Sequence, residues 1–104
     1  MIVHYMPLSK HQIKYLVTLT HNLKPVIMVG QNGLTENVLK ELEIAVNHHE
    51  LVKIKIAGDD RESRDEIINK ILKSASAEKV KAIGKTLTLF RRNTKNPKIE
   101  LPKK

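Results

Sequence analysis

The chain has 104 residues, with 19 Lys and Arg side chains against 11 Asp and Glu side chains and a formal net charge of +8. This length predicts one domain, and the absence of Cys excludes a disulfide framework, a thiolate zinc site and a Cys nucleophile. No apolar run is long enough for a membrane span and no signal peptide is visible, so we expect a cytoplasmic protein without a membrane partner.

The excess of positive charge favours a polyanionic partner, and nucleic acid is the first candidate. Residues 91–104 carry six Lys and Arg side chains against one Glu, which is a net charge of +5. We therefore expect a domain over residues 1–92 and a flexible basic tail over residues 93–104, which is either a solubilising terminus or an electrostatic arm. Because the chain has only two Tyr, one Phe and no Trp, a sheet that stacks RNA bases on aromatic rings is not expected.

Residues 9–22 are predicted to form the first helix. Ser9 and Gln12 have the spacing of a capping box, in which each side chain bonds the backbone N–H of the other residue. Lys10 and Lys14 fall on one face beside the apolar stripe. This face is either simply solvated or a contact for phosphate groups.

The next elements form a strand, a helix and a second strand. Residues 26–29 are apolar on both faces, which predicts a buried central strand. The segment Gly30-Gln31-Asn32-Gly33 follows, and Thr35 is the expected N-cap of a helix that runs to about His49. Residues 51–56 (LVKIKI) alternate between apolar and Lys side chains, so we expect a strand with one buried and one solvated face. Because a helix joins the two strands, they should run parallel.

The last elements are a helix and a hairpin. Asp59 or Ser63 is the expected start of the third helix, and residues 80–83 and 86–91 are the expected strands of the hairpin. Gly84-Lys85 between them indicates a type II′ turn. The predicted fold is α/β, a compact two-layer sandwich in the order α-β-α-β-α-β-β with a four-stranded mixed sheet.

The segment Gly30–Gly33 is the most informative candidate site. Its glycines allow a ligand to approach the backbone closely, and it lies before a helix N-terminus, where free N–H groups and the helix dipole favour an anion. Gln31 and Asn32 add neutral hydrogen-bonding groups for sugar or phosphate oxygens. The local pattern alone fits a structural turn as well. The dinucleotide and nucleoside-triphosphate motifs are both absent.

The remaining polar clusters do not indicate catalysis. The five histidines have no metal-ligand spacing, and the acidic residues between 59 and 66 suit the start of a helix. We expect no enzyme, no cofactor, no metal and no small-molecule substrate.

Three segments together resemble a known family. Residues 23–35 (LKPVIMVGQNGLT), 48–56 (HHELVKIKI) and 83–91 (IGKTLTLFR) are similar, in order and spacing, to the chloroplast RNA-splicing and ribosome-maturation (CRM) domain, in its small bacterial stand-alone form, the YhbY type. The resemblance implies an RNA-binding module similar in shape to the C-terminal domain of bacterial translation initiation factor three.

The resemblance also implies a role and a site. It implies association with precursors of the large ribosomal subunit and RNA contact at the loop residues Gly30, Gln31, Asn32 and Gly33. Lys24, Lys10 and Lys14 are added from expected proximity and charge. Some family members carry a basic residue in this loop, whereas here the charge must come from neighbours.

The resulting hypothesis is a non-catalytic RNA-binding protein that binds rRNA in precursors of the large ribosomal subunit during ribosome assembly. Two alternatives remain at this stage: a general nucleic-acid-binding protein, and a protein-interaction module of an RNA-processing complex.

Overall fold

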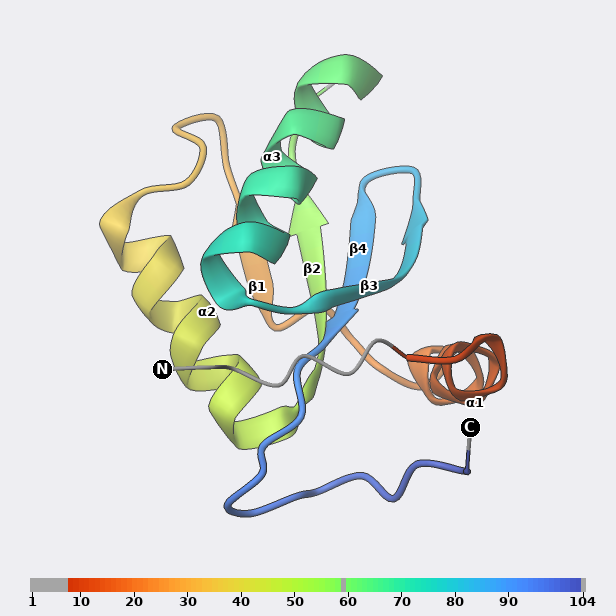
Figure 1. The fold of residues 1–104 in the computed structure, drawn as a ribbon. Coiled ribbons are helices and arrows are strands. Elements are labelled where there is room, and N and C mark those ends of the chain that lie inside the picture. Colours follow the sequence, from red (N-terminus) through yellow and green to blue (C-terminus); the bar gives the residue numbers. More distant parts are fainter. Residues whose placement is uncertain (1–7, 59, 104) are drawn as a thin grey trace.

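The computed structural model describes residues 8–58 and 60–103 (Figure 1). The elements in these residues are α1 (Lys10–Thr20), β1 (Ile27–Val29), α2 (Glu36–His49), β2 (Leu51–Ile56), α3 (Arg61–Ala75), β3 (Glu78–Ile83) and β4 (Thr86–Phe90). The predicted α/β class, the element order and the four-stranded mixed sheet are confirmed.

The strands lie in the order β1-β2-β4-β3, with β1 parallel to β2 and both other pairs antiparallel. The prediction of a buried central strand over residues 26–29 is wrong, because β1 is an edge strand. The side chain of Met28 is 63% exposed, between the buried Ile27 and Val29. A run of apolar residues is compatible with burial on both faces of a strand. It does not reveal whether another element covers the face on which Met28 lies.

One face of the sheet packs against α2 and α3 and forms the main core. Alternate residues of a strand point to the same face, so β2 and β4 each contribute a regular set of apolar side chains. The buried members from these strands and helices are Leu42, Val46, Val52, Ile54, Ile56, Ile68, Ile71, Ala75, Leu87 and Leu89.

The helix α1 packs against one end of the opposite face. Its Leu16 forms a second buried cluster with Leu51, Val80 and Phe90. The predicted capping box is confirmed: Ser9 Oγ accepts the Gln12 N–H at 3.1 Å, and Gln12 Oε1 accepts the Ser9 N–H at 3.1 Å. A bulge between Lys79 and Lys81 interrupts the pairing of β3 with β4 at Val80.

Two local predictions for the second half of the chain have different outcomes. The expected start of α3 at Asp59 or Ser63 is not what the structure shows: Asp59 lies outside the described residues, and the N-cap is Asp60. Ser63 lies in the first turn instead, and its hydroxyl donates to Asp60 Oδ2 at 2.9 Å. In the hairpin, Gly84 has a φ of +55°, as a turn with glycine in its first central position requires.

The segment after β4 folds back onto the domain. Glu50, at the end of α2, is fully buried and has a φ of +61°. Its carboxylate accepts the backbone N–H groups of Asn93, Lys98 and Ile99 at 2.7, 2.6 and 2.7 Å. Residues 93–104 are predicted to be a flexible tail; in the structure, Ile99 and Leu101 pack against the cluster around Leu16 of α1.

Candidate nucleic-acid interface

The loop Gly30–Gly33 is a tight turn between β1 and α2. The Gly33 N–H donates to the Gly30 carbonyl at 3.0 Å, and the Thr35 N–H donates to the Gly33 carbonyl at 3.1 Å. Gly33 has a φ of +72°, a conformation in which a side chain would be strained. Thr35 is the N-cap of α2, as predicted, and its hydroxyl accepts the Val38 N–H at 3.2 Å.

The outer surface of this loop is open. A Cβ atom added at Gly30 or Gly33 would meet no heavy atom within 4 Å, so neither glycine is required for packing inside the chain. Gln31 and Asn32 are exposed at the tip. The first N–H groups of a helix have no acceptor within the helix, so an anion placed here would meet backbone donors. The exposed Glu36 carboxylate in the first turn of α2 offsets part of this attraction.

The predicted lysines do not lie beside the loop. Lys24 precedes β1, whereas Gly30 follows it, so the two residues lie at opposite ends of this strand. Lys10 and Lys14 are exposed on α1, which packs at the same end of the sheet as Leu51. Figure 1 shows α1 at one end of the sheet and the loop after β1 at the other. The structure therefore separates the candidate residues into two groups.

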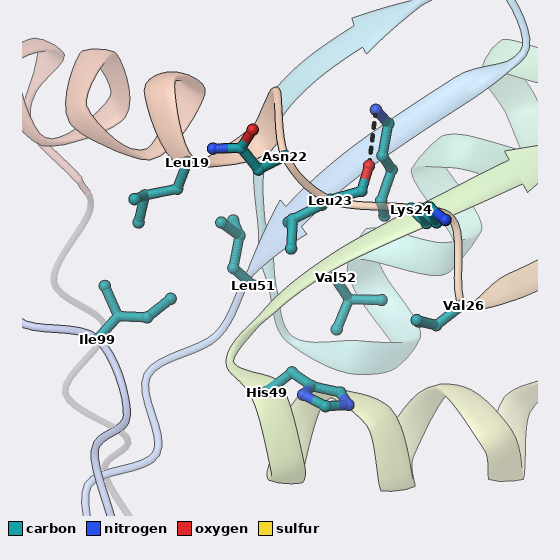
Figure 2. Close-up of a pocket in the computed structure, with 10 residues that line it drawn as sticks. Leu19, Asn22, Leu23, Lys24, Val26, His49, Leu51, Val52 and Ile99 are labelled. Carbon is teal, nitrogen blue, oxygen red and sulfur yellow. Dashed lines mark hydrogen bonds between the residues drawn. The ribbon is translucent and has the colours of Figure 1, made fainter.

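Lys24 lies at the rim of a hollow of about 470 Å³ (Figure 2). Apolar side chains from α1, the segment after it, β2 and the C-terminal segment form most of its lining, and Asn22, Lys24, His49 and Lys53 add polar groups. The Lys53 ammonium group donates to the Leu23 carbonyl at 3.4 Å, which is the dashed line in Figure 2. The hollow can therefore accept a partly apolar group with an anion near Lys24.

Charge is divided unevenly between the helices α2 and α3 and the other elements. The helices α2 and α3 together carry six Asp and Glu side chains against five Lys and Arg side chains. By contrast, α1 and the four strands carry six Lys and one Glu. The positive charge that the composition revealed is thus concentrated on α1 and on the sheet, as well as in the C-terminal segment.

Three of these lysines are candidate contacts that the sequence analysis missed. Lys53 and Lys55 lie on β2 and Lys81 lies on β3. The only signal in the sequence is the alternation of Lys with Ile in residues 53–56, and this alternation is equally typical of an ordinary solvated face. Nothing in the sequence shows that the β3 lysine lies on the same face, because that depends on the pairing of both strands with β4.

Among the acidic residues before and within α3, Asp60 caps the N-terminus of the helix. Asp60 Oδ1 accepts the Glu62 N–H at 3.2 Å. The hydrogen bond from the Ser63 hydroxyl, together with that N–H, lowers the pKa of the exposed Asp60 carboxyl. In the described ranges, no group of three or more His, Asp or Glu side chains is placed to hold a metal ion. Likewise, no helix among these residues has the length and apolar content that a bilayer crossing demands.

Known proteins are similar to this chain along nearly its whole length. Residues 8–91 match the model of the CRS1 / YhbY (CRM) domain. A protein from Haemophilus influenzae named as an RNA-binding protein is 50% identical over 97 residues, which are 93% of this chain and 97% of that protein. A protein from Pseudomonas aeruginosa named as a probable RNA-binding protein is 41% identical over 90 residues, which are 86% of each chain.

A solved structure has the same fold. The solution structure of a hypothetical protein from Staphylococcus aureus matches with a TM-score of 0.79 and 28% sequence identity. The match covers 92% of this chain and 100% of that one.

Proposed function

Since the chain belongs to the CRS1 / YhbY (CRM) domain family, we propose that it is a non-catalytic RNA-binding protein. The relatives named as RNA-binding proteins support this proposal. The observation that carries it is the open Gly30–Gly33 turn at the start of α2, in a molecule whose α1 and sheet are strongly basic.

The proposed mechanism is electrostatic and uses the backbone. The loop N–H groups that form no hydrogen bond within the turn, and the first two N–H groups of α2, donate to phosphate oxygens. Gln31 and Asn32 reach sugar hydroxyls, including the 2′-hydroxyl that distinguishes RNA from DNA. Lys24, Lys10 and Lys14 neutralise phosphates further along the strand. Because these lysines lie at the far end of the sheet from the loop, one RNA segment must extend along the molecule to contact both groups.

The proposed target is rRNA in precursors of the large ribosomal subunit, in the cytoplasm. This target rests on the resemblance of the three sequence segments to the bacterial stand-alone form of the family. Because the relatives of this family are named as RNA-binding proteins, we propose that the protein acts by binding and not by catalysis.

Sucrose-gradient sedimentation of a cell lysate tests this function, with the protein detected by blotting at low and moderate salt. We expect co-sedimentation with precursors of the large subunit that is lost as salt rises. Neutralising about 4–6 phosphates predicts a slope of about −3 to −5 for log affinity against log salt concentration, because counterions are released from the RNA.

Three results would contradict the proposal in different ways. Migration only in the light fractions at low salt would remove the ribosomal target. Equal competition by matched DNA would indicate a general nucleic-acid-binding protein. An association that resists both salt and ribonuclease would indicate a protein-interaction module.

A further inference from the structure

The face of the sheet opposite α2 and α3 is covered only at one end. The cluster around Leu16 of α1 covers Leu51, Val80 and Phe90. Beyond that cluster, the strand pairing leaves two rows of side chains on this face. The row next to α1 is Lys53, Thr88 and Lys81, and the row next to the loop end is Met28, Lys55, Thr86 and Ile83.

The first row forms the floor of a hollow of about 200 Å³ against the end of α1. None of the residues that line this hollow is acidic: they are Thr20, His21, Lys53, Lys81, Ile83, Thr86 and Thr88. Lys53 and Lys81 are half-buried. Among the residues that the structure describes, no carboxylate forms an ion pair with either ammonium group.

Half-buried cations without a counter-charge create a focused positive potential. The walls of a hollow have a low dielectric constant and screen a charge less than water does, so the hollow attracts anions. The Lys53 ammonium group donates to the neutral Leu23 carbonyl at 3.4 Å. Since an ammonium group has three donors, two N–H groups remain for a ligand.

The second row joins this hollow to the loop. Lys55 is exposed between Met28, which is 63% exposed, and the row's Thr86. Ile83 at the other end of the row is 61% exposed. The Ala57 N–H donates to the Val29 carbonyl at 2.8 Å, so the ends of β1 and β2 lie side by side where the loop begins. This face therefore lies between α1 and the Gly30–Gly33 loop.

We propose that this open sheet face binds the phosphates of a single-stranded RNA segment. The proposal rests on the proposed function and extends it: one strand runs from α1, through the hollow with Lys53 and Lys81, past Lys55, to the loop. The charge complementarity of the face selects a polyanion. Because contacts to phosphates carry no sequence information, binding on this face tolerates any base sequence.

The test compares two doubly substituted proteins with the same net charge. Lys53→Gln with Lys81→Gln removes two cations from the open face. Lys70→Gln with Lys73→Gln removes two exposed cations from α3, which covers the opposite face. Fluorescence anisotropy measures the affinity of each protein for a labelled single-stranded RNA of about 12 nucleotides, within the range that small binding domains cover.

We expect the open-face variant to bind about tenfold more weakly near 0.15 M salt. The slope of log affinity against log salt concentration should become shallower by about 1.5, because fewer counterions leave the RNA when two phosphate contacts are lost. The α3 control should stay within about twofold of the unsubstituted protein. If the open-face variant binds like the control, the face is not an RNA contact, and a protein partner becomes the occupant to seek.

A second variant guards against loss of folding. Lys55 is exposed, so Lys55→Gln should keep the thermal midpoint and weaken binding by about fourfold through one lost phosphate contact. An unchanged affinity would overturn the inference even if the double variant were unfolded. If the unsubstituted protein binds no RNA, the proposed function fails together with this inference. If it binds RNA and only the open-face variants are neutral, the inference alone fails.

Discussion

At the scale of single residues, the two glycines of the loop have different roles. Gly33 needs its positive φ of +72°, so a side chain there would strain the turn. Gly30 has no such requirement, and the space where its Cβ would lie is empty. Gly30 is therefore the position at which a substitution can test RNA contact without disturbing the fold.

The Gly30→Asp substitution places a carboxylate where the proposed function puts a phosphate. We expect RNA affinity to fall about tenfold, which corresponds to about 1.4 kcal/mol, while circular dichroism and the thermal midpoint stay unchanged. Asn69→Asp on the exposed side of α3 adds the same charge far from the loop and is the matched control. Equal affinities of the two variants would remove the loop from the proposed interface.

At the scale of elements, one side chain joins the end of β4 to two helices. The Arg91 guanidinium group donates to both carboxylate oxygens of Glu43 at 3.0 and 2.9 Å, to Asn47 Oδ1 at 2.8 Å and to the Ala75 carbonyl at 2.9 Å. It therefore connects α2 with the last residue of α3. The hydrogen bond from Arg91 holds the pKa of the Glu43 carboxyl below its usual value of 4.5.

This lowered pKa predicts how the contribution of Glu43 depends on pH. A carboxyl whose pKa is lower in the folded state adds stability above its unfolded pKa and loses it as pH falls through the folded value. At neutral pH, Glu43→Gln should therefore cost about 0.5 kcal/mol, a small value because the Glu43 side chain is half exposed. That is about 2–4 °C in the thermal midpoint.

Thermal unfolding at two pH values checks this expectation. The midpoints of the Glu43→Gln variant and the unsubstituted protein should differ at pH 7 and converge as the pH falls through the lowered pKa of the Glu43 carboxyl. A difference of the same size at both pH values would show that the Gln side chain disturbs packing and that the ion pair contributes nothing.

At the scale of the whole molecule, the C-terminal segment is held by a buried carboxylate. Glu50 has no exposed surface and accepts three backbone N–H groups from residues 93–99. In addition, Gln12 of α1 donates to the Pro102 carbonyl at 3.0 Å, and Ile99 and Leu101 pack against the α1 cluster. The segment thus connects α1 with the end of α2, and we propose that it is part of the folded domain.

Removal of residues 93–104 tests this proposal. We expect a loss of about 2–3 kcal/mol, since two partly buried apolar side chains leave the cluster and Glu50 loses its hydrogen bonds. The thermal midpoint should fall by about 10–20 °C. Removal of residues 103–104 alone keeps Ile99, Leu101 and the contacts of Glu50, and it should leave the midpoint unchanged. A full truncation without effect would support a flexible tail from residue 93.

Patterns of residues within a few positions of one another are enough to predict the local features of this protein. Short-range patterns predicted the order of the elements, the capping box of Ser9 and Gln12, the Thr35 cap and the glycine turn of the hairpin, because each depends on residues only a few positions apart. The same patterns identified Gly30–Gly33 as the loop that precedes α2.

Which distant residues lie together depends on the tertiary structure. Met28 is exposed because β1 is an edge strand, and Lys24 lies far from Gly30 because a strand separates them. Lys53 and Lys81 share a face because both pair across β4. The contacts of Glu50 join residues more than 40 positions apart in the chain. Long-range pairing depends on how the strands and helices pack around the core. The local periodicity of the sequence does not determine that arrangement.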